Sequence, residues 1–122
     1  MDKLFSKFMA LLHSIEYMIT SLIDSGLIFF DDDIAFLRSV LSALSKCNTK
    51  RECYDNLVSL LKFARRFLDF LPYDEKEVVE QNLRPNSKFL ERIFESDDTS
   101  ILFETIRSFA VSLLDEIKDF ER

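Results

Sequence analysis

The sequence has no tryptophan, one glycine, two prolines and one histidine among its 122 residues. Turns in all-β proteins depend on glycine and proline, so this shortage argues against an all-β fold. Loops that cradle phosphate need several glycines, so a nucleotide-dependent enzyme is not expected. The composition favours helices.

Long uncharged apolar runs are also missing. A membrane-spanning helix needs roughly 18 to 20 such residues, and Glu16, Asp24, Arg38 and Arg65 interrupt each candidate. The N-terminal residues lack the basic region and the small-residue cleavage site of a secretory signal. We therefore expect a soluble protein without a membrane span, located in the cytoplasm of a cell or of an infected host.

Cysteine is scarce as well, with only Cys47 and Cys53. Their spacing fits neither a zinc site nor a thioredoxin-like pair. The two residues flank a turn, and this spacing would permit a bridge. Because cysteines in the cytoplasm stay reduced, we predict two free thiols, with Cys47 filling the core near the end of a helix.

Apolar residues are abundant, at 48% of the chain, and 13 residues are phenylalanine. They recur in steps of three and four along most of the sequence, which is the period of an amphipathic helix. We predict an all-α fold, a compact bundle of five to six helices forming one domain over residues 1–122. The central helix should cover about residues 50–71, since this segment is apolar around most of its circumference, and Pro72 should end it.

Local signals place several helix ends. Gly26 fits the left-handed position that closes a first helix, and Asp31–Asp33 suit the start of a second, where carboxylates gain from the helix dipole. The apolar residues Leu27–Phe30 between them should pack on the core. Thr49 and Glu52 have the spacing of a capping box at the start of the third helix.

No catalytic, cofactor-binding or metal-binding residue is predicted. Consecutive carboxylates at a helix start point about 100° apart, so Asp31–Asp33 do not converge on an ion. His13 has no nucleophile motif with it and should lie at the edge of a buried helix face. We expect no cofactor and no enzymatic activity.

The central segment carries two candidate contact surfaces. The first is a basic patch that phosphate groups or an acidic partner could contact, formed by Lys62, Arg65 and Arg66. The second is an apolar interaction face formed by Phe63, Phe67 and Phe70. The first, third and last helices each carry two apolar rows, more than a small domain can enclose, so one face should bury against a partner helix or a second copy. A crowded monomeric core with some exposed phenylalanine is the other interpretation.

The segment "SILFETIRSFAVSLLDEI", from Ser100 to Ile117, resembles the closing helix of the small poxviral Bcl-2-like proteins. This resemblance implies a single helical domain without enzymatic activity, and a viral inhibitor of host signalling. The chain lacks the tryptophan-containing signature of Bcl-2 proteins, since it has no tryptophan. The resemblance assigns no functional residue.

We therefore predict a non-enzymatic helical interaction protein: an adaptor, an inhibitor or a small subunit of an assembly. A protein partner or a homo-oligomer would cover its apolar helix face, with charged rims setting orientation. The alternative is a small subunit of a nucleoprotein complex that contacts RNA or DNA through the basic patch. The net charge of -6 repels nucleic acid in general, so this partner is not favoured.

Overall fold

The computed structural model describes residues 2–26, 31–84, 87–95 and 99–120. These residues form six α-helices and one short 3₁₀ helix, which confirms the predicted all-α bundle. The elements are α1 (Asp2–Asp24), α2 (Asp31–Lys46), α3 (Lys50–Arg66), η1 (Leu68–Phe70), α4 (Tyr73–Asn82), α5 (Ser87–Phe94) and α6 (Ser100–Phe120). Among the described helices, none has the length and apolar character needed to cross a bilayer.

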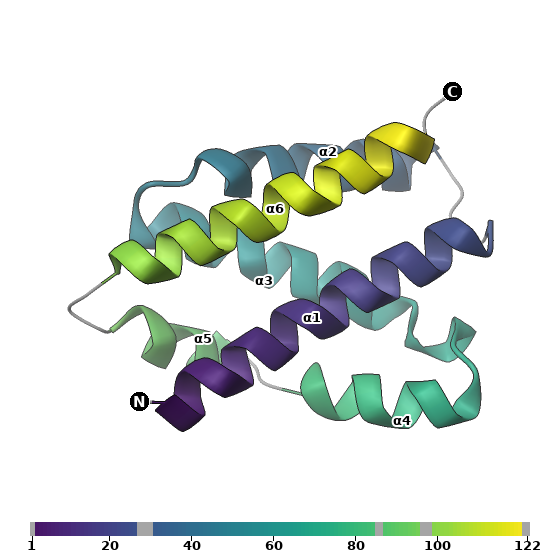
Figure 1. The fold of residues 1–122 in the computed structure, drawn as a ribbon, viewed down its shortest axis with the longest axis horizontal. Coiled ribbons are helices and arrows are strands. Elements are labelled where there is room, and N and C mark those ends of the chain that lie inside the picture. Colours follow the sequence, from purple (N-terminus) through teal and green to yellow (C-terminus); the bar gives the residue numbers. More distant parts are fainter. Residues whose placement is uncertain (1, 27–30, 85–86, 96–98, 121–122) are drawn as a thin grey trace.

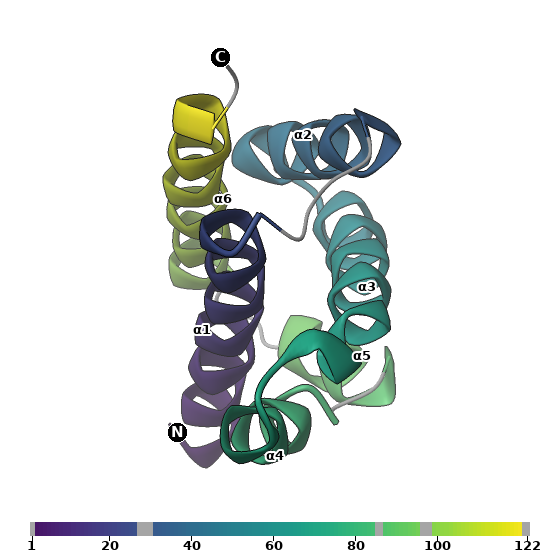
Figure 2. The ribbon, with the colours of Figure 1, turned by 90° about the vertical axis from the view of Figure 1, so that its right-hand side faces the viewer.

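The first and last helices lie side by side and run in the same direction (Figure 1). The view in Figure 2 shows α1 and α6 on one side of the bundle, with α2 and α3 on the other. Helix α6 also contacts α2, and α1 also contacts α4 and α3. The surface shared by α1 and α6 is therefore separated from the outer surface of α2 and α3 by the core.

The core is built from the apolar rows that the sequence predicts. From α1 it takes Phe8, Leu11, Leu12, Ile15, Met18, Ile19 and Leu22, and from α6 it takes Leu102, Ile106, Ala110, Leu113 and Ile117. Full burial of one such large side chain contributes about 1.5 to 3 kcal/mol relative to exposure. Most residues of both apolar rows of α1 are buried within a single molecule. The apolar surface left exposed is therefore smaller than the sequence suggests.

Helix α3 is shorter than the predicted central helix. It ends at Arg66, and the chain tightens into η1 before Leu71. Leu71 has extended backbone angles (φ -83°, ψ 149°), as expected for a residue that precedes proline. The helical spacing of apolar residues continues through α3 and η1. For that reason the sequence pattern alone places the end of the central helix at residue 71.

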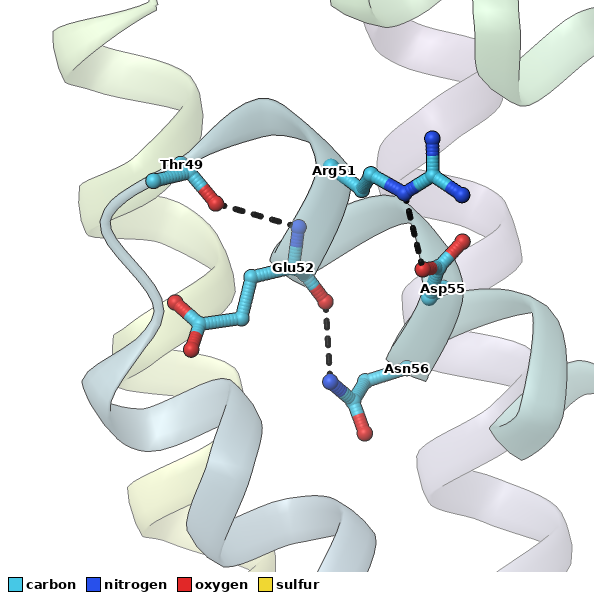
Figure 3. A network of polar contacts seen from close by, with 5 residues as sticks. All are labelled: Thr49, Arg51, Glu52, Asp55 and Asn56. Carbon is cyan, nitrogen blue, oxygen red and sulfur yellow. Dashed lines mark hydrogen bonds and ion pairs between the residues drawn. The ribbon is translucent and has the colours of Figure 1, made fainter.

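The start of α3 agrees with the predicted capping box (Figure 3). The Thr49 hydroxyl accepts a hydrogen bond of 3.2 Å from the backbone N–H of Glu52. The Glu52 carboxylate accepts one of 3.2 Å from the N–H of Asn48, one residue before the position that the motif specifies. These bonds satisfy N–H groups that have no partner inside the helix.

Two further helix ends agree with the sequence. Gly26 follows α1 with φ +72°, in the left-handed region that glycine enters without steric cost, and its N–H donates to the Ile23 carbonyl at 3.1 Å. Helix α2 begins at Asp31, the first of the three aspartates. The predicted packing of Leu27–Phe30 lies outside the described residues.

The cysteines are not free thiols, contrary to the sequence-based prediction. Cys47 and Cys53 form a disulfide with their Cα atoms 5.5 Å apart, and both residues are fully buried. The prediction failed because it inferred the redox state from the expected compartment, whereas the α2–α3 corner brings the two residues within bonding distance. A bridge closing so short a loop contributes about 2 kcal/mol in the chain-entropy account.

Polar contacts join α4 to α1. The Tyr17 hydroxyl donates a hydrogen bond to the Glu75 carboxylate, and the Asn82 amide donates one of 3.0 Å to the buried Ser14 hydroxyl. The bond to Glu75, with partial burial as a smaller cause, raises the pKa of Tyr17 above its usual value of 10.0. The protonated tyrosine is therefore the form that holds the two helices together.

We predict that Tyr17→Phe lowers the free energy of unfolding by less than about 1 kcal/mol near neutral pH, because the bond is exposed to water. The raised pKa means that this contribution is complete below pH 10 and is lost as the pH rises through the folded-state pKa. Urea unfolding of both proteins at neutral pH and above pH 10 measures it. The control is Tyr73→Phe on α4, which removes a largely exposed hydroxyl. Equal effects of the two variants near neutral pH would contradict the prediction.

Candidate interaction surfaces

Four phenylalanine rings form a continuous row across α2, α3 and η1. Phe36 of α2 stacks on Phe63 of α3 with 5.3 Å between ring centroids. Phe63 then contacts Phe67 at 4.9 Å, and Phe67 contacts Phe70 at 5.9 Å. We call these four residues the aromatic row. Offset and tilted ring pairs at such distances add about 0.5 to 1.5 kcal/mol each beyond burial, so the row is itself a stabilising element.

The row is buried in the middle and exposed at both ends. Phe63 is only 2% exposed, whereas Phe36 is 38% and Phe70 is 55% exposed. Phe67 is half-buried. Of the three residues in the predicted apolar face, the structure thus places Phe70 and part of Phe67 on the surface and Phe63 inside, between Phe36 and Phe67.

Phe36 belongs to this surface although the sequence did not assign it there. On α2 it lies beside the stripe of Leu37, Leu41 and Leu44, at a position that helical spacing treats as the edge of the buried face. Its exposure depends on how α2 crosses α3, which a single helical period does not encode. A large aromatic residue at the edge of an amphipathic stripe was the available signal.

Arg66 covers the middle of the aromatic row. Its guanidinium lies 5.1 Å from the ring centroid of Phe63 and 5.5 Å from that of Phe67, within the range of cation–π attraction. Its Nη2 also lies 3.5 Å from Asp33 Oδ1 on α2. The ion pair is partly exposed and contributes at most about 1 kcal/mol, so its main effect is to fix the guanidinium over the rings.

The predicted basic patch divides into residues with different surroundings. Arg65 is half-buried and turns toward the end of α4, where Nε donates to the Leu83 carbonyl at 2.9 Å and Nη2 donates to the Arg84 carbonyl at 3.1 Å. Carbonyls at a helix C-terminus lack partners inside the helix, so Arg65 satisfies them. Lys62 and Arg66 remain exposed. The three cations therefore do not present one surface.

A groove lies between α1 and α6. These two helices lie together on one side of the bundle (Figure 2). It has a volume of about 440 Å³ and is partly open to solvent. The exposed side chain of His13 lines it together with Glu16 of the same helix and Glu104 of α6. The edge position predicted for His13 is therefore part of this groove, which the sequence alone did not reveal.

The described residues contain no group of three or more histidine, cysteine, aspartate or glutamate side chains that could hold a metal ion. Comparison with known proteins finds no family model, no curated protein and no solved structure that matches the chain.

Arg65 and Lys62 should respond differently to the same substitution. We predict that Arg65→Met lowers the free energy of unfolding by about 1 to 2 kcal/mol, because it leaves the carbonyls at the end of α4 without their charged donor. Lys62→Met removes the same charge from an exposed site and should change stability by less than about 0.5 kcal/mol. Urea unfolding of both variants gives the comparison. Equal losses of unfolding free energy would show that Arg65 does not stabilise the end of α4.

Proposed function

We propose that this chain is a non-enzymatic interaction protein, an adaptor, inhibitor or small assembly subunit, that binds a protein partner through the aromatic row. The observation that supports it is the exposure of Phe36 and Phe70 at the two ends of a row whose middle residue, Phe63, is buried between neighbouring rings. Aromatic side chains, phenylalanine included, are enriched in protein interfaces, and a few well-packed residues near the centre of an interface carry most of the binding energy. An exposed ring held in place by buried neighbours suits that role.

Charges beside the row would orient the partner. Arg66 offers a cation over the rings, and Asp33 offers a carboxylate at their edge. Lys62 lies one turn before Arg66 on the same face of α3, so a positive strip borders the row along α3. A complementary partner would place acidic groups opposite this strip, which chiefly affects specificity and the association rate.

The partner is a different protein or a second copy of this chain. In a symmetric dimer the aromatic row of one copy would pack against the aromatic row of the other. Arg66 of one copy would then lie near Asp33 or near Arg66 of the other copy. Sedimentation over a wide concentration range separates these two forms of the proposal.

We predict that Phe70→Glu abolishes partner binding, or self-association where sedimentation detects it, and leaves the fold intact. A charge placed within an apolar contact costs at least about tenfold in affinity. Val111→Glu is the matched control, because Val111 is similarly exposed, at 48%, on α6. Circular dichroism verifies folding, and affinity purification from the native cells compares the two variants. The proposal fails if Phe70→Glu retains every partner that Val111→Glu retains.

Other functions gain less support from the geometry. Contact with nucleic acid needs the basic patch to act together, and Arg65 is engaged with the end of α4. A viral inhibitor of host signalling, which the resemblance of residues 100–117 implies, is one form of the interaction proposal and adds no residue to the aromatic row.

We propose a cytoplasmic location, which the sequence pattern of the first helix favours. The disulfide is an argument against this location, because such bonds persist mainly in oxidising compartments. The redox state of Cys47 and Cys53 in the native cells therefore tests whether the protein is cytoplasmic. Acid quenching followed by alkylation under denaturing conditions, read by mass, should find two free thiols in a cytoplasmic protein. A bridged pair would overturn the cytoplasmic location.

A further inference from the structure

The groove between α1 and α6 has an apolar floor. Met9 and Leu12 of α1 and Phe109 of α6 line it. Leu12 is buried and the other two are half-buried, so they present apolar surface without projecting from it. Ile101, at 60% one of the most exposed large apolar side chains among the described residues, stands at the end near the start of α6. Water covers this apolar surface unless another group does.

The walls of the groove are acidic. Glu16 on α1 and Glu104 on α6 contribute one carboxylate each, and none of the ten described residues that line the groove is lysine or arginine. Arg107, the arginine one turn after Glu104, points to the other side of α6, where its Nε donates to the Cys47 carbonyl at 2.8 Å. An occupant with cationic flanks would therefore meet complementary charge on both walls.

The shape is that of a trough for an elongated ligand. The residues of α6 that line it run from Ile101 to Ser112, which at 1.5 Å per residue is about 16 Å, or three helical turns. Ser108 and Ser112 are small, so a helix laid along α6 could approach closely. Since α1 and α6 run side by side in the same direction (Figure 1), a third helix between them would contact α6 along this length and α1 along the shorter stretch from Met9 to Glu16, about 10 Å.

We infer that this groove binds a basic amphipathic helix of a partner protein, with its apolar row on the floor and lysine or arginine side chains facing Glu16 and Glu104. A second copy of the chain is disfavoured, because the chain carries a net charge of -6 and a symmetric contact would set the same carboxylates against each other. The inference goes beyond the proposed function, since it uses a surface formed by α1 and α6, whereas the aromatic row belongs to α2, α3 and η1.

The first test selects ligands without assuming a sequence. A phage library of helical peptides of about 18 residues, long enough to fill three to five turns, is selected on the full chain. The enriched peptides are then tested for binding to Ile101→Ser, with Val78→Ser at an equally exposed valine of α4 as the matched control. The expected result is enrichment of amphipathic peptides with lysine or arginine beside the apolar row, which bind the Val78 variant and not the Ile101 variant. Failure to enrich any peptide, or enrichment of acidic peptides, would overturn the inference.

The second test separates local charge from net charge. Glu104→Lys and Glu77→Lys each raise the net charge by two units, but Glu77 lies exposed on α4, away from the groove. Calorimetry with one enriched peptide should show a loss of about tenfold or more for the Glu104 variant and less than about threefold for the Glu77 variant. Equal losses would mean nonspecific attraction and would overturn the inference. Phe70→Glu should leave the affinity for this peptide unchanged. The inference about the groove and the proposal about the aromatic row can therefore be refuted separately.

Discussion

Packing of the apolar rows of α1, α2, α3 and α6 into one core decides which side chains of this protein face solvent. Once these rows are turned inward, the outer face of each helix is set by its 3.6-residue period, and the arrangement of helices sets which outer faces adjoin. The exposed ends of the aromatic row and the groove between α1 and α6 are both consequences of that arrangement.

Contacts far apart in sequence then tie the smaller elements to this core. Arg65 holds the end of α4 through the carbonyls of Leu83 and Arg84, and Tyr17 holds the start of the same helix through Glu75. Helix α4 buries only Val79 among its own residues, so these polar contacts help to position it. A short, acidic helix is thereby fixed without a large apolar face.

The sequence predicts the helices well and the surfaces poorly, for a physical reason. Helical period, Gly26, Thr49 and the aspartates at the start of α2 are local signals, and each is written within one or two turns of chain. The burial of Phe63, the exposure of Phe36 and the direction of Arg65 depend on which helix lies alongside. The disulfide shows the same limit, because its formation depends on the geometry of a corner rather than on composition.

The bridge between Cys47 and Cys53 has a consequence for how the aromatic row would meet a partner. It cross-links the corner that joins α2 to α3, and these are the two helices that carry Phe36 and Phe63. A covalent tie at that corner limits the relative movement of the two helices before any encounter. Association would then not need to order them, and less of the interaction free energy would be lost as conformational entropy.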